Sequence, residues 1–251
     1  MNILRNFING NFESSSETID DTNPATGEVI ATIPRSNSTD IQKAVDAASK
    51  ARQSWSNLSI KNRTKWLHKI ADSLESRSEE IATLESLDTG KPINLARAVD
   101  ASRSIANFRF FADFAEKFGN EEFVMDDAIN HVLYKPVGIA GLITPWNLPL
   151  YLLSWKIAPA IVMGNTVVAK PSELTPLTAN LLAEVISDID LPRGVINIIH
   201  GFGSEAGQAI VEHPQINLIS FTGGTETGKK VAKTAAPMFK KLSLELGGKN
   251  A

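Results

Sequence analysis

Two polar side chains near the middle of the chain could take part in chemistry, because each follows an apolar run that predicts a buried strand. Asn147 follows the run 139–143, and Lys170 follows the run 166–169. In an open parallel sheet, ligands bind just beyond the carboxyl ends of the strands. Both residues are therefore expected near a binding site, and the stretch Val137–Pro176 that holds them is expected to organise the chain.

The side chain of Asn147 suits acyl chemistry. Its amide donates two hydrogen bonds without carrying charge, so it could hold an oxygen that becomes negative during a reaction. The alternative is an Asn that only forms the turn after Pro145-Trp146. The residue type alone favours the turn, because Asn is a preferred turn residue.

Lys170 and Glu173 form a pair that suits a nucleotide. A Lys at a strand end can reach ribose or phosphate oxygens, and a nearby carboxylate can accept hydrogen bonds from ribose hydroxyls. Such a carboxylate would repel a 2′-phosphate and so favour NAD over NADP. The alternative is a solvent-exposed salt bridge, which is worth little to stability. The two residues by themselves leave both interpretations open.

Glycine-rich turns follow two later predicted strands. One turn holds Gly203 and Gly207, and the other holds Gly223 and Gly224. Both precede predicted helices, where backbone N–H groups can face a phosphate. Neither matches the G-x-G-x-x-G spacing, and glycine pairs in such turns are usually just tight connections.

Glu245 lies between Leu244 and Leu246 in the last predicted strand. A carboxylate among apolar neighbours should have a raised pKa, which is the condition for a general base at neutral pH. The alternative is a strand of alternating polarity whose Glu faces solvent. The four histidines show no spacing typical of metal ligands, so no metal site is expected.

Composition restricts the class of protein. The 251 residues are 43% hydrophobic and 21% charged, with a formal net charge of −3, as in an ordinary globular protein. The weakly acidic balance argues against nucleic acid or an anionic membrane as the main partner. The absence of cysteine removes disulfides and a cysteine nucleophile from this chain. No signal peptide and no apolar stretch of about 20 residues is found, so a cytoplasmic protein is expected.

The periodicity predicts an α/β fold. Short strands and turns fill residues 1–38, a helix follows a capping box at Thr39 and Gln42, and a long helix covers about Asn94–Phe118. A hairpin is predicted within Glu121–Pro136. Five apolar strands alternating with helices then predict a Rossmann-like parallel sheet with helices on both faces. These strands are Ile139–Ile143, Thr166–Ala169, Val195–Ile199, Leu218–Phe221 and Leu242–Leu246.

Taken together, the motifs resemble those of the NAD(P)-dependent aldehyde dehydrogenase superfamily. They are, in order, Trp146-Asn147 with Pro149, Lys170 to Glu173, Phe221 to Thr225, and Glu245 to Lys249. The resemblance extends from Asn6–Gly10 to the last residue. It implies that Asn147 is the oxyanion-hole amide, that Glu245 is the base that activates water, and that Lys170 and Glu173 contact the adenosine ribose.

The resemblance also implies NAD as the cofactor and further coenzyme positions. These are Thr144, Trp146, Gly203, Gly207, Phe221, Gly223 and Gly224. Many relatives carry Ser where this chain has Gly224. The glycine lacks the hydroxyl that could touch phosphate, but its backbone can still make the contact.

Two segments resemble the 2-hydroxymuconic and 2-aminomuconic semialdehyde dehydrogenases in particular. They are Asn107–Ala112 and Pro145–Ala160. The substrates of those enzymes carry a carboxylate beyond the aldehyde, and Arg103 matches the position of an Arg that binds it. The alternative is a surface Arg on a helix rich in Arg. Trp155 matches a residue of the aldehyde tunnel, although a large aromatic side chain could equally belong to the core.

The resemblance implies a division into parts. Residues 1–118 form the N-terminal part of the coenzyme domain, 119–136 start an oligomerisation hairpin, and 137–251 form the NAD-binding core. The catalytic domain with its nucleophilic cysteine is absent, so a piece of a longer enzyme is expected. The complete protein is expected to form homodimers or homotetramers. A non-catalytic NAD-binding fragment is the alternative.

Overall fold

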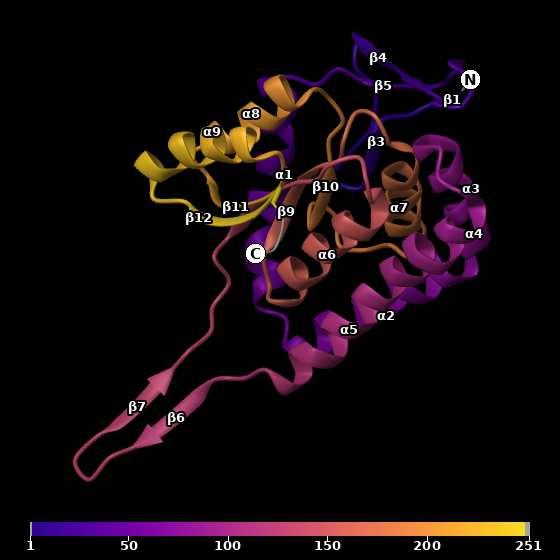
Figure 1. Ribbon diagram of the computed structural model, residues 1–251. Coiled ribbons are helices and arrows are strands. Elements are labelled where there is room, and N and C mark those ends of the chain that lie inside the picture. Colours follow the sequence, from indigo (N-terminus) through magenta and orange to yellow (C-terminus); the bar gives the residue numbers. More distant parts are fainter. Residues whose placement is uncertain (1, 249–251) are drawn as a thin grey trace.

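A seven-stranded sheet forms the centre of the computed structural model, which describes residues 2–248 (Figure 1). Its strands lie in the order β12 (Lys241–Leu246), β11 (Ile216–Gly223), β8 (Ile139–Ile143), β9 (Thr166–Lys170), β10 (Ile196–Ile198), β2 (Asn6–Ile8) and β3 (Asn11–Glu13). The first five are mutually parallel, which confirms the predicted core. The N-terminal strands β2 and β3 extend it in antiparallel fashion, which the sequence did not predict.

Helices cover both faces of this sheet (Figure 1). On one face pack α2 (Ile60–Ser76), α5 (Ser102–Lys117), α6 (Pro149–Val162) and α7 (Leu177–Asp188), and on the other α1 (Ser38–Ser56), α8 (Gln208–Glu212) and α9 (Thr225–Ala235). Within β8, Ala140 and Leu142 join the first apolar cluster, whereas Ile139 and Ile143 join the second. The continuous apolar run of β8 therefore serves two cores, because successive side chains point to opposite faces.

Smaller elements flank the sheet. A three-stranded sheet contains β1 (Asn2–Ile3), β5 (Val29–Pro34) and β4 (Thr18–Thr22). The predicted hairpin consists of β6 (Glu121–Val124) and β7 (Ile129–Val132), and it projects away from the rest of the chain (Figure 1). Two short segments, η2 (Gly203–Gly207) and η3 (Ala236–Met238), precede α8 and follow α9.

The start of α1 differs from the predicted capping box at Thr39 and Gln42. Asn37 is the N-cap: its side chain accepts from the Thr39 N–H at 2.8 Å, and Asp40 accepts from the Asn37 N–H at 3.2 Å. Gln42 instead donates to Asp46 at 2.9 Å on the helix surface. The prediction was wrong because Asn and Asp form the same reciprocal cap two residues earlier.

The predicted long helix near residues 94–118 consists of three consecutive segments. They are α4 (Ile93–Leu95), the π-helical segment η1 (Ala96–Ala101) and α5. The preceding helix α3 (Ser78–Thr89) ends at Gly90, whose left-handed conformation (φ of 74°) lets the chain turn toward α4. The π-helical segment buries Asp100 completely. Such segments occur often at functional sites, because they alter which side chains face inward.

Candidate active site

The candidate residues gather at one edge of the sheet because the strands that carry them are parallel. Asn147 follows β8, Lys170 ends β9, and Gly203 lies in η2 beyond β10. Gly223 ends β11, and Glu245 lies near the end of β12. The carboxyl ends of all five strands meet at this edge, which is where open α/β sheets bind ligands.

Part of the predicted coenzyme site forms a pocket of about 480 Å³ between β8, β11, η2 and α9. Four predicted residues line it: Glu173, Gly203, Gly207 and Phe221. The other lining residues are Ile143, Phe202, Ser204, Gln208, Val211, Thr227, Lys230 and Val231. Sequence reasoning missed Phe202 and the two valines. Their apolar character carries no signal until the fold places them around one cavity.

Lys170 and Glu173 form an ion pair at the wall of this pocket. The Lys170 ammonium donates to Glu173 at 3.0 Å and to the carbonyls of Pro171 and Gly201 at 2.7 Å and 2.8 Å. The Lys170 side chain is only 2% exposed and that of Glu173 is 26% exposed, so the alternative of a solvent-exposed bridge is wrong. Burial lowers the pKa of Lys170, and the charge of Glu173 opposes that effect. An ammonium group has three N–H donors, and these three acceptors use all of them. Because one acceptor is the Glu173 carboxylate, Lys170 holds Glu173 toward the pocket.

Four other predicted coenzyme residues lie outside the lining of this pocket. Thr144 is buried, and its hydroxyl has no hydrogen-bond partner within residues 2–248. Trp146 is exposed, whereas Gly223 ends β11. Gly224 is the N-cap of α9, where free backbone N–H groups suit an anion. The structure therefore brings these four to the same edge without enclosing them.

Asn147 lies in an exposed bend between β8 and α6. Its backbone carbonyl accepts from the Lys91 ammonium at 3.3 Å. No hydrogen bond of its side-chain amide is found within the described part of the chain. An Asn that shaped the turn through its side chain would bond to the local backbone. The geometry thus leaves the amide available to a ligand.

Glu245 is exposed, which agrees with the alternative of a Glu that faces solvent and not with a carboxylate buried among leucines. The physical reason is topological: β12 is the outermost strand of the sheet, and its neighbours Leu244 and Leu246 are half-buried and exposed. Residues two apart on a strand share a face, so Glu245 points to the same side as Ser243, which pairs in register with Ser220 of β11.

Lys156 of α6 lies on that same side, and sequence reasoning did not assign it a role. The buried ammonium donates to Ser220 at 2.8 Å. Burial lowers the pKa of Lys156 to about 8, and the nearby charge of Glu245 acts against that shift. A lysine inside the apolar run 148–163 was the available signal. The site thus contains a carboxylate and an adjacent amine that titrates close to neutral pH.

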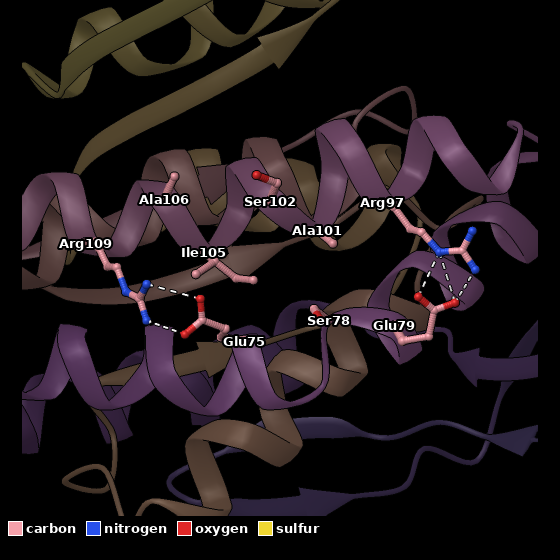
Figure 2. Close-up of a pocket in the computed structure, with 9 residues that line it drawn as sticks. All are labelled: Glu75, Ser78, Glu79, Arg97, Ala101, Ser102, Ile105, Ala106 and Arg109. Atoms are coloured by element: carbon pink, nitrogen blue, oxygen red, sulfur yellow. Dashed lines mark hydrogen bonds and ion pairs between the residues drawn. The ribbon is translucent and has the colours of Figure 1, made fainter.

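The three arginines of η1 and α5 differ in whether they form ion pairs. Arg97 bonds to Glu79, and Arg109 bonds to Glu75 at 2.7 Å. Both pairs lie along a pocket of about 570 Å³ between α5 and α2 (Figure 2). Arg103 is exposed and has no ion pair or hydrogen bond within residues 2–248. Of the three, Arg103 is the one whose guanidinium is available to a carboxylate.

One face of η1 and α5 lies beside the start of α6. This face, called the stripe below, contains Asp100 and Asn107. Asp100 contacts Lys91, which reaches Asn147, and Asn107 donates to the Tyr151 carbonyl at 3.1 Å. Residues three and four apart share a helix face. Arg103 lies between Asp100 and Asn107 in the sequence and is exposed, whereas its neighbour Ser104 is buried and donates to the Asp100 carbonyl.

Trp155 continues this stripe on α6. Its ring meets Phe111 edge-on at a centroid distance of 5.6 Å and Tyr151 at 5.9 Å. The Trp155 side chain is 46% exposed, so the alternative of a core residue is wrong. The aromatic group forms a partly open apolar surface next to the candidate catalytic residues.

Residues 2–248 contain neither a candidate metal site nor a candidate membrane-spanning helix. No group of His, Cys, Asp or Glu side chains there has the arrangement needed to hold a metal ion. None of the helices in this part of the chain has the length and apolar character needed to cross a membrane.

Comparison with known proteins places the chain in a family. The model of the aldehyde dehydrogenase family matches residues 12–251. The chain is 50% identical to 2-aminomuconic semialdehyde dehydrogenase of Danio rerio, over 99% of this chain and 51% of the relative. It is 45% identical to 2-hydroxymuconic semialdehyde dehydrogenase of Pseudomonas sp. (strain CF600), over 100% of this chain and 54% of that protein.

A solved structure agrees with these relatives. The NAD⁺ complex of an aldehyde dehydrogenase from Bacillus cereus superposes with a TM-score of 0.95 at 40% identity, over 98% of this chain and 51% of the other. The chain spans about half the length of the curated relatives it matches. The match from residue 12 to 251 and the shared fold show that this chain belongs to the aldehyde dehydrogenase family.

Proposed function

We propose that the protein carrying this chain oxidises an aldehyde to its carboxylic acid with NAD as the hydride acceptor. The observation that carries the proposal is that one edge of the sheet holds a pocket lined by predicted coenzyme residues, the Asn147 amide without a partner in residues 2–248, and the carboxylate of Glu245. Family membership supports the reaction class. The relatives named as semialdehyde dehydrogenases support a substrate with a second acidic group.

The pocket suits the adenosine part of NAD. Phe202 and Val211 offer apolar walls, and Gly203 and Gly207 let a ligand approach the backbone. Lys170 binds one oxygen of Glu173, which leaves the other to accept from ribose hydroxyls. A negative side chain at this wall opposes a 2′-phosphate, so we propose NAD in preference to NADP. NAD, when bound, supplies the hydride acceptor.

The chain's own residues then have distinct roles. Asn147 holds the substrate oxygen as it becomes negative, and Glu245 takes a proton from the water that hydrolyses the acyl intermediate. Lys156 is near enough to Glu245 for the charge of that carboxylate to favour the protonated amine. The acyl group is carried by a cysteine, which is not among these 251 residues and which we propose is supplied by the rest of the protein.

Arg103 is proposed to bind the carboxylate of the substrate. It is the arginine of its region without an ion pair in the described structure, and it lies on α5 between Asp100 and Asn107, which contact Lys91 and Tyr151. A bidentate contact between guanidinium and carboxylate would fix both charge and orientation. We therefore propose a carboxylated semialdehyde, such as 2-hydroxymuconic or 2-aminomuconic semialdehyde, as the substrate.

Substitution of Arg103 in the complete protein tests this assignment. Arg103→Ala should raise the KM for a carboxylated semialdehyde by roughly 10- to 150-fold, because a contact to a charged group is worth about 1.5–3 kcal/mol. The KM for a neutral aldehyde should hardly change. Arg97→Ala is the matched control, since Arg97 is already bound to Glu79.

Two results would contradict these proposals. Equal effects of Arg103→Ala on both substrates would remove Arg103 from the substrate site. If the complete wild-type protein formed no NADH from any aldehyde, the proposed oxidation itself would fail.

A non-catalytic NAD-binding protein is the second candidate, and the absence of cysteine from this chain favours it. Titration of the protein's fluorescence with NADH distinguishes the two together with the activity assay. Saturable binding with no turnover of any aldehyde would support the second candidate, and binding with turnover would support the first.

We also propose that the complete protein forms a homodimer or homotetramer. The hairpin β6–β7 exposes Phe123, Val124, Met125 and Ile129, an apolar surface that another copy could cover. The cytoplasmic location expected from the sequence stays a prediction.

A further inference from the structure

The loop that carries Asn147 is fixed by a neighbouring element rather than by its own hydrogen bonds. Within residues 2–248, the one hydrogen bond made by Asn147 is from the Lys91 ammonium to its backbone carbonyl, at 3.3 Å. Lys91 follows α3, and the turn that holds it is itself braced. Gly90 is left-handed, and the Ser86 hydroxyl donates to the Lys91 carbonyl at 2.7 Å.

Buried carboxylates hold the ammonium of Lys91 in place. Asp100 accepts from it at 2.8 Å, and Glu85 lies 3.9 Å away. Both carboxylate side chains are fully buried, whereas that of Lys91 is 13% exposed. Asp100 is one of the buried residues of the π-helical segment η1. The ammonium therefore has few other positions, because leaving would strand two buried carboxylates.

The same cluster fixes the far end of the loop. Glu85 accepts from the backbone N–H of Leu150, in the first turn of α6, at 3.0 Å, and from the Thr178 hydroxyl at 2.9 Å. Lys91 thus holds the carbonyl of Asn147 while Glu85 holds the N–H of Leu150. Between these anchors, the side-chain amide of Asn147 has no hydrogen-bond partner among residues 2–248.

We infer that Lys91 is a positioning residue that sets the side-chain amide of Asn147 for the oxyanion, through the backbone of the loop. The inference rests on the proposed function, since it assumes that Asn147 holds a substrate oxygen. A charge-assisted contact at the backbone suits this task because it restrains the loop without occupying the amide itself. Lys91 does not touch the substrate.

A double-mutant cycle in the complete protein tests the inference. Lys91→Met should lower kcat/KM for the aldehyde by about ten- to a hundredfold, somewhat less than the 10²–10³-fold expected for Asn147→Ala, because the amide is displaced rather than removed. In the Asn147→Ala background, Lys91→Met should have almost no further effect. The Kd for NADH should stay within about twofold in every variant. Lys65→Met, on the exposed side of α2, is the matched control.

Loss of Lys91 alone leaves Asp100 and Glu85 without their cation and could unfold the protein. The pair Lys91→Met with Asp100→Asn removes one charge of each sign and keeps the cluster balanced. It should retain the wild-type melting temperature and still show the loss in kcat/KM. Lys91→Arg, which keeps a donor of the same charge, should restore part of the activity.

Three outcomes would overturn the inference. They are an equal loss in both Asn147 backgrounds, unchanged kcat/KM in the balanced double variant, and a crystal structure of Lys91→Met in which the loop 147–150 has not moved. The crystal structure needs no activity. If the wild-type protein oxidised no aldehyde, the proposed function would fail, whereas movement of the loop would still decide whether Lys91 holds Asn147.

Discussion

The proposed coenzyme pocket and the proposed catalytic face share one sheet edge, yet they are built differently. The pocket is enclosed by side chains of β8, β11, η2 and α9, and its carboxylate Glu173 is held by the buried Lys170. On the catalytic face, Asn147, Glu245 and Arg103 are exposed. Of these three, Asn147 is supported one layer deeper, through Lys91, Asp100 and Glu85. A pocket can be completed by packing within one chain, whereas exposed groups need a buried network to fix their direction.

Among the substitutions that test this comparison, the largest effect on activity is expected for one at Glu245. Glu245→Gln in the complete protein should lower kcat by about 10²–10⁴-fold, because an amide cannot take a proton from water. The Kd for NADH should not change, since Glu245 lies outside the pocket lining. Steady-state kinetics and fluorescence titration measure the two quantities.

Glu226→Gln is the control for that experiment, because Glu226 is exposed and pairs with Lys229 at 2.7 Å. A fall in NADH affinity as large as the fall in kcat would break the proposed separation between pocket and catalytic face.

A second prediction concerns pH and the buried support of the catalytic face. Burial raises the pKa of Glu85 from 4.5 to about 7. Below pH 4.5 the group is protonated in both the folded and unfolded states, and its contribution to stability is fully present. As the pH rises toward 7, only the unfolded chain loses the proton. The contribution, about 3 kcal/mol, is therefore lost across this window.

Glu85→Gln should remove that part of the pH dependence and retain the acceptor for the Leu150 N–H. Melting temperatures across the window measure the difference between variant and wild type. The pH dependence of stability that comes from Lys170 in the pocket wall has the opposite sign. Burial lowers the pKa of Lys170, so the contribution of Lys170 to stability rises as the pH rises through that lowered pKa. Parallel pH curves for wild type and Glu85→Gln would contradict the argument.

The smallest effect is expected at the pocket wall. Glu173→Gln should raise the KM for NAD by about five- to tenfold, because a neutral acceptor makes a weaker hydrogen bond than a carboxylate. The KM for NADP should fall or stay constant. Glu184→Gln is the control, since Glu184 also pairs with a cation, Arg77, at 2.7 Å. An unchanged ratio of the two KM values would remove Glu173 from cofactor selection.

Much of the fold could be predicted because it depends on local pattern. The apolar run 139–143 became β8 with its predicted bounds, since a strand buried on both faces needs apolar residues at every position. The hairpin near residues 121–132 was also predicted. The antiparallel addition of β2 was not, because Phe7 and Ile198 pair across the sheet although they are distant in the sequence.

The candidate site was predictable in part for the same reason. Residue types at strand ends named Asn147, Lys170 and Glu173, and the motifs named Glu245. The exposure of Glu245 could not be read from its leucine neighbours, because it depends on the place of β12 at the sheet edge. The position of Lys156 was missed, since only the packing of α6 brings it beside Ser220.

The sequence by itself determined the family, the alternation of strands and helices, and the side chains able to do chemistry. Only the tertiary structure decided which of these side chains form hydrogen bonds or ion pairs within residues 2–248 and which do not. Lys170 is buried against three acceptors, Lys91 reaches the Asn147 carbonyl from the turn after α3, and Arg103 remains unpaired in the described structure while Arg97 and Arg109 do not. The physical reason is that hydrogen bonds and ion pairs depend on distances between atoms, and those distances exist only after the elements have packed.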